Sequence, residues 1–175
     1  MEITYLGHSC FRIIGKNLTC VTDPFSEDVV GLKLPKLIAD VVIVTHKHAG
    51  HSDLTKIKDN PLVLDGPGEY EVQGSEFKGI LAFHDEKRGE ERGRVTLFTF
   101  EIDDIRICHL SDLGSELDTE QLEEINGVDV LMIPCGGVVT INSEIAAKLV
   151  SEIEPKIVIP MHYRIGKMTE FESVE

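Results

Sequence analysis

Three of the seven histidines in this 175-residue chain lie within six residues, in the stretch His46-Lys47-His48-Ala49-Gly50-His51. The stretch directly follows 40–45, a short apolar run typical of a strand buried on both faces. Two imidazoles separated by one residue can bind one ion from a bent loop, and His51 can reach a second point nearby. Imidazole nitrogens suit zinc and neighbouring transition metals. The spacing therefore predicts a metal site rather than a polar surface loop.

Two further histidines end predicted strands. His109 lies in the strand predicted over 105–110, and His162 follows the strand predicted over 156–160. Asp112, three residues beyond His109, offers a carboxylate that can bridge two ions. Each residue alone also fits a structural role, as a buried histidine or a turn-forming aspartate beside a glycine. Because ligands often gather just past strand ends, we interpret all three as metal ligands.

Four more residues are candidates with an equally reasonable structural interpretation. His8 lies in the loop after the first predicted strand, and His84 ends the strand predicted over 79–84, so either imidazole could reach the site. Arg164 could pair with an anionic substrate group or lie on the surface. Glu69 could act as an acid or base, or simply belong to its turn.

The elements that must position these residues are mostly strands. Each half of the chain contains a hairpin, a loop with an aspartate, and a buried strand that begins Asp-Val, with helices between strands. This pattern predicts one α/β domain over 1–175, with two sheets packed face to face and helices outside. The predicted strands are 2–5, 10–14, 18–22, 40–45, 61–64, 70–72, 79–84, 94–101, 105–110, 128–133 and 156–160, and the predicted helices are 118–125 and 143–153.

Composition narrows the class of partner. The net charge of −14 disfavours nucleic acid, because an acidic surface repels phosphate. No apolar run approaches the roughly 18 residues of a membrane helix, and the first residues lack the features of a signal peptide. We therefore expect a soluble cytoplasmic protein with a small-molecule substrate and no membrane partner. Bound metal adds local positive charge, so an anionic substrate is compatible with the acidic chain.

These residues together resemble the metallo-β-lactamase superfamily. The family's HxHxDH motif matches 46–51, its later histidine matches His109, its bridging aspartate matches Asp112, and its final histidine matches His162. Asp23 matches an early aspartate that orients the histidine loop and is not a ligand. The resemblance implies a four-layer αβ/βα sandwich of two mixed sheets with helices outside. It also implies one or two zinc ions, with manganese or iron as alternatives.

One position departs from the family pattern. Gly50 stands where the motif has an aspartate that ligates the second ion. By analogy, the first ion keeps His46, His48 and His109, whereas the second keeps His51, His162 and Asp112. With one carboxylate missing, we expect a weaker or partly occupied second site. The opening Tyr5-Leu6-Gly7-His8 resembles the branch that contains the ascorbate-6-phosphate lactonase-like hydrolases.

The resemblance implies a hydrolase that uses metal-activated water on a small ester, lactone or phosphate ester. Asp112 would hold the ions and accept a proton, and His84 or His8 would assist the leaving group. Alternatively, His84 could replace the ligand that is lost at Gly50. The absence of the aspartate at Gly50 favours an alternative, a non-catalytic metal-binding domain of the same fold. A redox or oxygenase role with iron is a third alternative, because some members of the superfamily bind iron. Substrate, metal identity and oligomeric state stay open at this point.

Overall fold

A computed structural model describes residues 1–167, in which short strands dominate and the helices are few. The strands are β1 (Glu2–Gly7), β2 (Cys10–Ile14), β3 (Thr19–Thr22), β4 (Leu37–Ile38), β5 (Val41–Ile43), β6 (Ile57–Lys58), β7 (Leu62–Leu64), β8 (Gly68–Val72), β9 (Ser75–Phe83), β10 (Arg94–Ile102), β11 (Ile105–His109), β12 (Val130–Pro134) and β13 (Ile157–Met161). The helices are α1 (Glu27–Val30), the single 3₁₀ turn η1 (Leu54–Lys56), α2 (Thr119–Ile125) and α3 (Ser143–Ile153).

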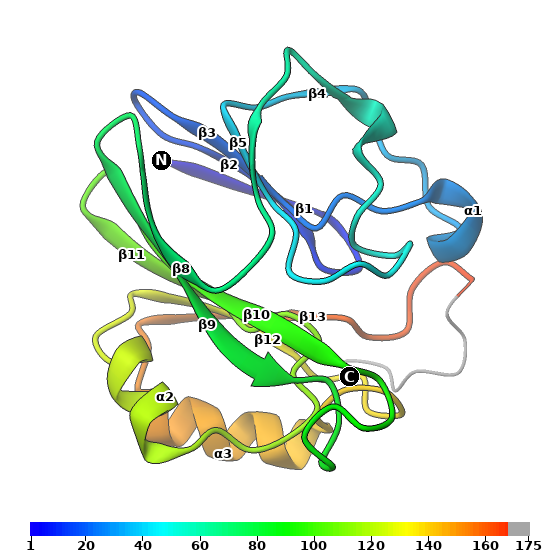
Figure 1. The fold of residues 1–175 in the computed structure, drawn as a ribbon, viewed down its shortest axis with the longest axis vertical. Coiled ribbons are helices and arrows are strands. Elements are labelled where there is room, and N and C mark those ends of the chain that lie inside the picture. Colours follow the sequence, from blue (N-terminus) through cyan, green and yellow to red (C-terminus); the bar gives the residue numbers. More distant parts are fainter. Residues whose placement is uncertain (168–175) are drawn as a thin grey trace.

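Two mixed sheets form the body of the molecule (Figure 1). One has five strands in the order β1-β2-β3-β5-β7, and the other has six in the order β13-β12-β11-β10-β9-β8. In each sheet the hairpin strands run antiparallel and the strands reached by crossovers run parallel. The two-sheet α/β architecture expected from the sequence is confirmed.

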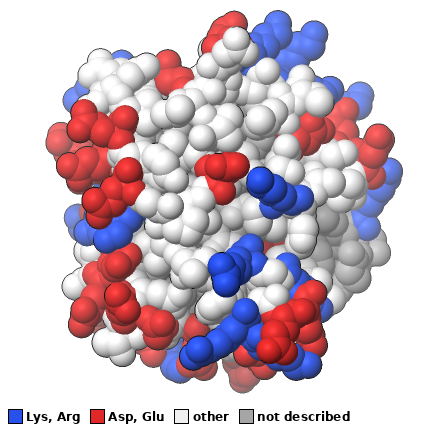
Figure 2. Space-filling model, in the orientation of Figure 1, with Lys and Arg blue, Asp and Glu red and all other residues white. Residues whose placement is uncertain are grey.

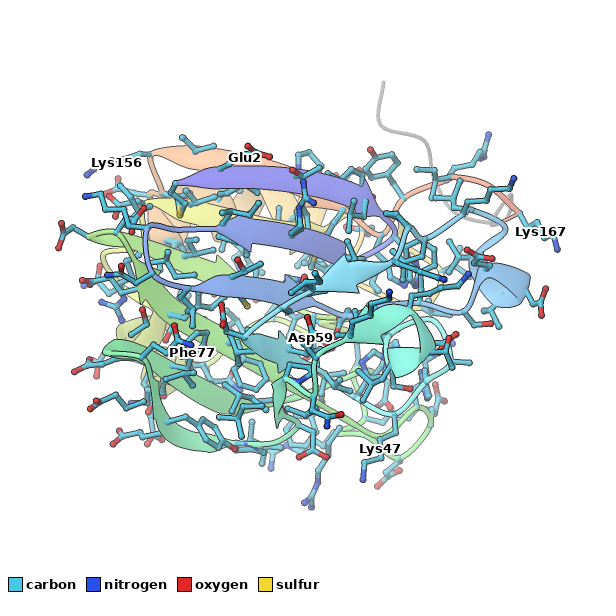
Figure 3. The ribbon with its side chains drawn as sticks, turned by 90° about the horizontal axis from the view of Figure 1, so that it is seen from above. Glu2, Lys47, Asp59, Phe77, Lys156 and Lys167 are labelled. Atoms are coloured by element: carbon cyan, nitrogen blue, oxygen red, sulfur yellow. The ribbon has the colours of Figure 1, made fainter. Side chains whose placement is uncertain are left out.

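The main core lies between the two sheets. Phe11, Ile13 and Ile43 from the five-stranded sheet are fully buried in one cluster with Phe98 and Met132 from the six-stranded sheet. The strands buried on both faces were recognisable as apolar runs in the sequence, because neither face presents polar residues to water. Charged side chains such as those of Lys156 and Glu2 lie at the periphery (Figure 3).

The outer layers of the sandwich differ from each other. Helices α2 and α3 cover the six-stranded sheet, where Leu149 of α3 is fully buried against that sheet's apolar residues (Figure 1). An irregular segment that includes the short α1 covers most of the outer face of the five-stranded sheet. Its buried side chains there are Phe25, Val30 and Leu34. Among residues 1–167, no helix is long and apolar enough to cross a membrane.

Local sequence signals explain the helix positions. Asp118 caps α2 in a reciprocal capping box with Gln121, and Asn142 caps α3 by accepting from the backbone N–H of Ile145. The sequence did not predict α1, β4 or β6, because one helical turn or a two-residue strand is too short to show a periodicity.

Strand pairing puts the carboxyl ends of β3 and β5 at one end of the first sheet, and those of β9, β11 and β13 at one end of the second. The contacts of Asp112 with His51, His84 and His162 bring these two ends together. The β1–β2 turn joins them there, since Phe11 at the start of β2 pairs with Thr22 at the end of β3. The loops that follow these strands carry the chemistry-bearing side chains.

Candidate metal centre

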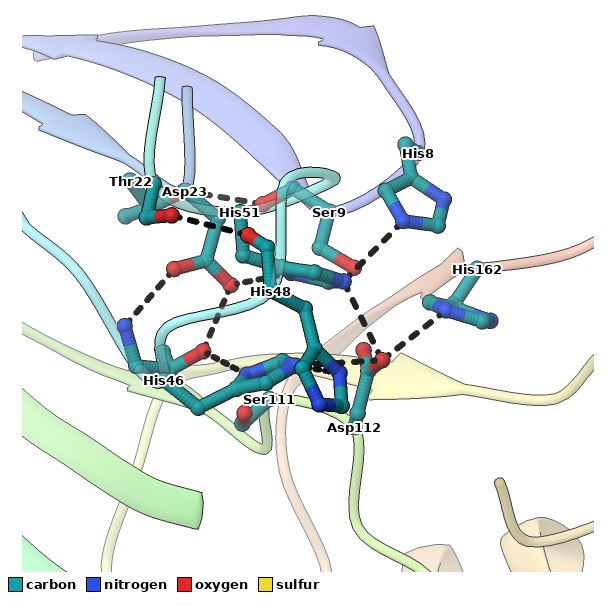
Figure 4. Close-up of polar contacts among 12 residues, drawn as sticks. His8, Ser9, Thr22, Asp23, His46, His48, His51, Ser111, Asp112 and His162 are labelled. Atoms are coloured by element: carbon teal, nitrogen blue, oxygen red, sulfur yellow. Dashed lines mark hydrogen bonds and ion pairs between the residues drawn. The ribbon is translucent and has the colours of Figure 1, made fainter. Parts of the chain in front are cut away.

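Six of the seven histidines converge on the carboxylate of Asp112. Figure 4 labels five of them, all except His84. Each comes from a loop at the carboxyl end of a strand or from the β1–β2 turn. The Nε2 atoms nearest Asp112 Oδ2 are those of His162 at 3.0 Å, His51 at 3.1 Å, His84 at 3.4 Å and His46 at 3.7 Å. His48 and His8 complete the set, which joins loops from both sheets.

The distances suit ligands of a shared ion. His46 Nε2 lies 3.1 Å from His48 Nδ1, and His8 Nε2 lies 3.0 Å from His51 Nε2. Two nitrogens bound tetrahedrally to one zinc at about 2.0–2.1 Å would be roughly 3.3 Å apart. Three groups have ligand atoms within 4.8 Å of one another: His46, His48 and His84; His46, His51 and Asp112; and His8, His51 and His162.

The surroundings of the Asp112 carboxylate favour a bound cation. It is 2% exposed, and its Oδ1 atom has no hydrogen-bond partner among the described residues. Burial alone would raise the pKa of Asp112, but the adjoining His162 and His51 outweigh burial and hold the pKa well below its usual range. A buried, ionised carboxylate with an unused oxygen fits a metal ligand, because a cation supplies the missing interaction.

Asp23 orients the histidine loop. Its Oδ1 accepts from the Thr45 backbone N–H at 2.8 Å, and its Oδ2 accepts from Thr45 Oγ1 at 2.7 Å and from His51 Nδ1 at 2.9 Å. His51 therefore presents Nε2 to the cluster. Because the Thr45 hydroxyl donates to Asp23, His46 Nδ1 must donate to Thr45 Oγ1 across 3.1 Å. In the neutral ring, His46 Nε2 therefore carries no proton and can bind an ion. Such outer contacts fix ligand tautomers in metal sites.

Alternate residues of this loop point in opposite directions. Lys47, between the two ligand candidates His46 and His48, points away from the molecule (Figure 3), and its side chain is 85% exposed.

The imidazoles differ in protonation. Burial lowers the pKa of His46 to about 3 and that of His8 to about 2, so both are neutral near pH 7. Burial also acts to lower the pKa of His51, but Asp112 and Asp23 outweigh it and raise that pKa to about 10. Without metal, His51 is thus an imidazolium that lies between two carboxylates.

The structure places His84, not His109, beside His46 and His48. His84 follows the end of β9, where its N–H donates to the Gly93 carbonyl at 3.1 Å. The Asp112 loop packs directly on it, because a Cβ on Gly114 would lie 2.2 Å from the His84 carbonyl carbon. Glycine at position 114 lets this loop approach closely enough to bring Asp112 and His84 together.

The prediction that His109 is a metal ligand does not agree with this geometry. His109 Nε2 donates to the Ser9 carbonyl at 2.9 Å, and His109 Nδ1 accepts from the Ser111 N–H at 3.1 Å. Both ring nitrogens are used, so no lone pair remains for an ion. His109 is the last residue of β11, with its ring edge-on to Phe11 in the sheet interface. It holds the β1–β2 turn in place.

The two remaining candidates are both exposed. Glu69 is outside the groups that could hold an ion and pairs with Lys78 at 3.8 Å, and Arg164 follows His162 by two residues. Sequence reasoning missed the positioning roles of Thr45, Ser9 and Ser111, and only Thr45 carries a signal, its position directly before the histidine loop.

Backbone strain gathers around the cluster. Four non-glycine residues at the site have positive φ: His8 at 55°, Asp23 at 39°, Ser111 at 53° and His162 at 52°. Each such conformation costs on the order of 1–2 kcal/mol in an L-residue. Strain of this kind persists where the surrounding structure holds a functional arrangement.

If His84 is a metal ligand and His109 is not, two alanine variants should behave in opposite ways. His84→Ala should lower bound zinc by about one ion per chain, since a zinc site needs at least three protein ligands. His109→Ala should keep its metal but lose roughly 1–3 kcal/mol of stability, because two buried backbone groups lose their partner. Elemental analysis and denaturant unfolding measure both. A folded His109→Ala protein that loses an ion would contradict the assignment.

The raised pKa of His51 predicts proton release on metal binding. His51 is protonated below its pKa of about 10, and an ion that takes Nε2 must displace that proton. At pH 6, below the pKa of about 7 of zinc-bound water, binding should release about one proton per chain. The affinity of the ion at His51 should therefore rise about tenfold per pH unit across neutrality. Calorimetry in buffers of different ionisation enthalpy measures the proton count, and zero release would refute this protonation state.

Comparisons with known proteins agree with the fold. A sequence model of the family described as "Beta-lactamase superfamily domain" matches residues 2–162. Proteins named UPF0173 metal-dependent hydrolase from Thermococcus onnurineus and Thermoplasma acidophilum are 30% and 31% identical, over 93% of this chain and 84% and 83% of their own. A Thermotoga maritima structure described as a candidate Zn-dependent hydrolase of the metallo-β-lactamase superfamily superposes with a TM-score of 0.82 at 37% identity, covering 97% of this chain and 80% of that one. The chain belongs to the metallo-β-lactamase superfamily, among relatives named as metal-dependent hydrolases.

Proposed function

We propose that this protein is a hydrolase that uses one or two zinc-class ions to activate water against a small ester, lactone or phosphate ester. The observation that carries the proposal is the buried Asp112 carboxylate, which two groups of imidazoles approach from different loops. When bound, such ions lower the pKa of water to about 7 and polarise the carbonyl or phosphoryl oxygen under attack.

The residues divide into two ligand groups. His46, His48 and His84 would hold the first ion, and His51, His162 and Asp112 the second. Asp112 Oδ2 lies within 3.7 Å of a nitrogen from each group, so its carboxylate is placed to join the two sites. The same carboxylate would orient the attacking water and accept its proton. His84 acts as a ligand of the first ion in this proposal, whereas the sequence left open a leaving-group role or a ligand role in place of the residue lost at position 50.

A pocket of about 230 Å³ beside His84 supports a small substrate. Its walls come from two loops, 84–92 and 138–140, which include Val138 and Thr140. Asp85 stiffens the first loop, because its carboxylate accepts four backbone N–H groups from residues 87–92. The pocket wall is therefore preformed.

The charge of this pocket favours a modestly polar substrate. Lys87 and Arg92 line it, but both pair with Glu91, at 2.6 Å and 3.6 Å. An anionic substrate group would have to compete with the Glu91 carboxylate for these cations. On the face drawn in Figure 2, acidic and basic side chains are likewise interspersed rather than segregated. A phosphorylated substrate, as the resemblance to the ascorbate-6-phosphate lactonase-like branch implies, would have to compete with Glu91 in this way.

Gly50 supports a second candidate, a metal-binding domain without catalysis. A carboxylate of the family motif is missing there, so the charge around the second ion differs from that of the family pattern. An activity assay distinguishes the two candidate functions. A metal-loaded protein that hydrolyses no ester, lactone or phosphodiester would favour the non-catalytic domain.

The proposal predicts that His48→Ala loses both an ion and turnover. Removing one of three imidazoles releases the first ion, so hydrolysis should fall by at least about 10²-fold, the loss that follows when one electrostatic stabiliser of a transition state is removed. Lys47→Ala is the matched control, because the neighbouring side chain is exposed and should leave metal content and rate unchanged. Elemental analysis and initial rates on chromogenic esters and lactones measure both. A fully metallated, active His48→Ala enzyme would end the proposal.

A further inference from the structure

The space beside Gly50 is already occupied. A Cβ built on Gly50 would lie 3.0 Å from His8 Nε2 and 3.4 Å from His8 Cδ2. The backbone of Gly50 is outside the left-handed region, so conformation alone would allow another residue at this position. The His8 imidazole thus lies against the position of a Cβ at residue 50, closer than ordinary van der Waals contact.

We propose that His8 replaces the missing carboxylate as a ligand of the second ion, which is then held by His8, His51 and His162 together with Asp112. The inference rests on the proposed function for the identity of the site, but it concerns which atoms hold the ion. His8 Nε2 lies 3.0 Å from His51 Nε2, and the His8 ring centroid lies 4.3 Å from that of His162. His8, His51 and His162 are buried and bring their ligand atoms within 4.8 Å of one another.

The chain holds the His8 backbone firmly. Its carbonyl accepts both the Tyr5 hydroxyl and the His162 N–H at 2.9 Å. The adjacent Ser9 carbonyl accepts from Thr22 Oγ1 at 3.1 Å and from His109 Nε2 at 2.9 Å. These bonds maintain the positive φ of His8 and tie the turn to both sheets. A ligand held in this way loses little conformational entropy on binding an ion.

An imidazole ligand in place of an aspartate changes the chemistry of the second site. An imidazole is neutral where an aspartate is anionic, so the site carries one negative charge fewer around the same ion. Nitrogen ligands suit zinc, whereas carboxylates suit manganese and magnesium. The second site should therefore prefer zinc over manganese more strongly than the same site with an aspartate at position 50.

Three variants test the exchange by metal content. His8→Ala should bind the second zinc ion more weakly than the natural chain does, because the site falls from four protein ligands to three. His8→Ala/Gly50→Asp should regain that affinity, since removal of the ring makes room for the carboxylate, and should bind manganese more tightly than the natural chain does. Gly50→Asp alone should bind the second ion more weakly than the double variant. Elemental analysis after dialysis, with metal-free thermal unfolding as the folding control, gives these values.

A direct readout on the natural chain covers the case in which His8→Ala fails to fold. With ¹¹³Cd bound and the imidazoles labelled with ¹⁵N, the His8 Nε2 resonance should show a scalar coupling to cadmium. Absence of this coupling, or two ions of undiminished affinity in folded His8→Ala, would overturn the role of His8. Neither result would affect the proposed hydrolase, which fails instead if the metal-loaded natural chain is inert on every substrate class.

Discussion

A buried carboxylate determines how the histidine cluster of this protein is arranged. Asp112 is ionised and almost fully enclosed, and such a group is costly unless opposite charge or strong hydrogen bonding compensates it. The imidazoles of His51 and His162 approach one of its oxygens to within 3.1 Å, and the other oxygen has no hydrogen-bond partner among the described residues. A divalent cation satisfies these demands together, which is why we interpret the cluster as a metal centre.

The site exists only because two sheets meet. His8 and His51 come from the five-stranded half of the chain, whereas His84, Asp112 and His162 come from the six-stranded half. Between them lie contacts that bind no ion themselves, such as Asp23 on His51 and His109 on the Ser9 carbonyl. The rigidity of the ligands is therefore a property of the sandwich, and strain at the turns is balanced by bonds that cross from one sheet to the other.

Regular elements and clustered ligands were predictable from the sequence, but directions of side chains were not. Buried apolar runs located the central strands, and the close spacing of His46, His48 and His51 indicated a metal site. His84 and His109 both end strands, so the sequence could not distinguish the ring that faces the cluster from the ring that hydrogen-bonds with the backbone. The packing of His8 beside position 50 depends on a long-range turn contact that no local pattern encodes.

The most direct test is anomalous diffraction from zinc-loaded crystals, recorded on both sides of the zinc absorption edge. Our account predicts two peaks about 3.5–4 Å apart, the spacing of paired catalytic ions, with the Asp112 carboxylate between them. One peak should lie among His46, His48 and His84, and the other should lie near His51 and His162. Peaks that avoid Asp112, or an ion coordinated by His109, would contradict the account.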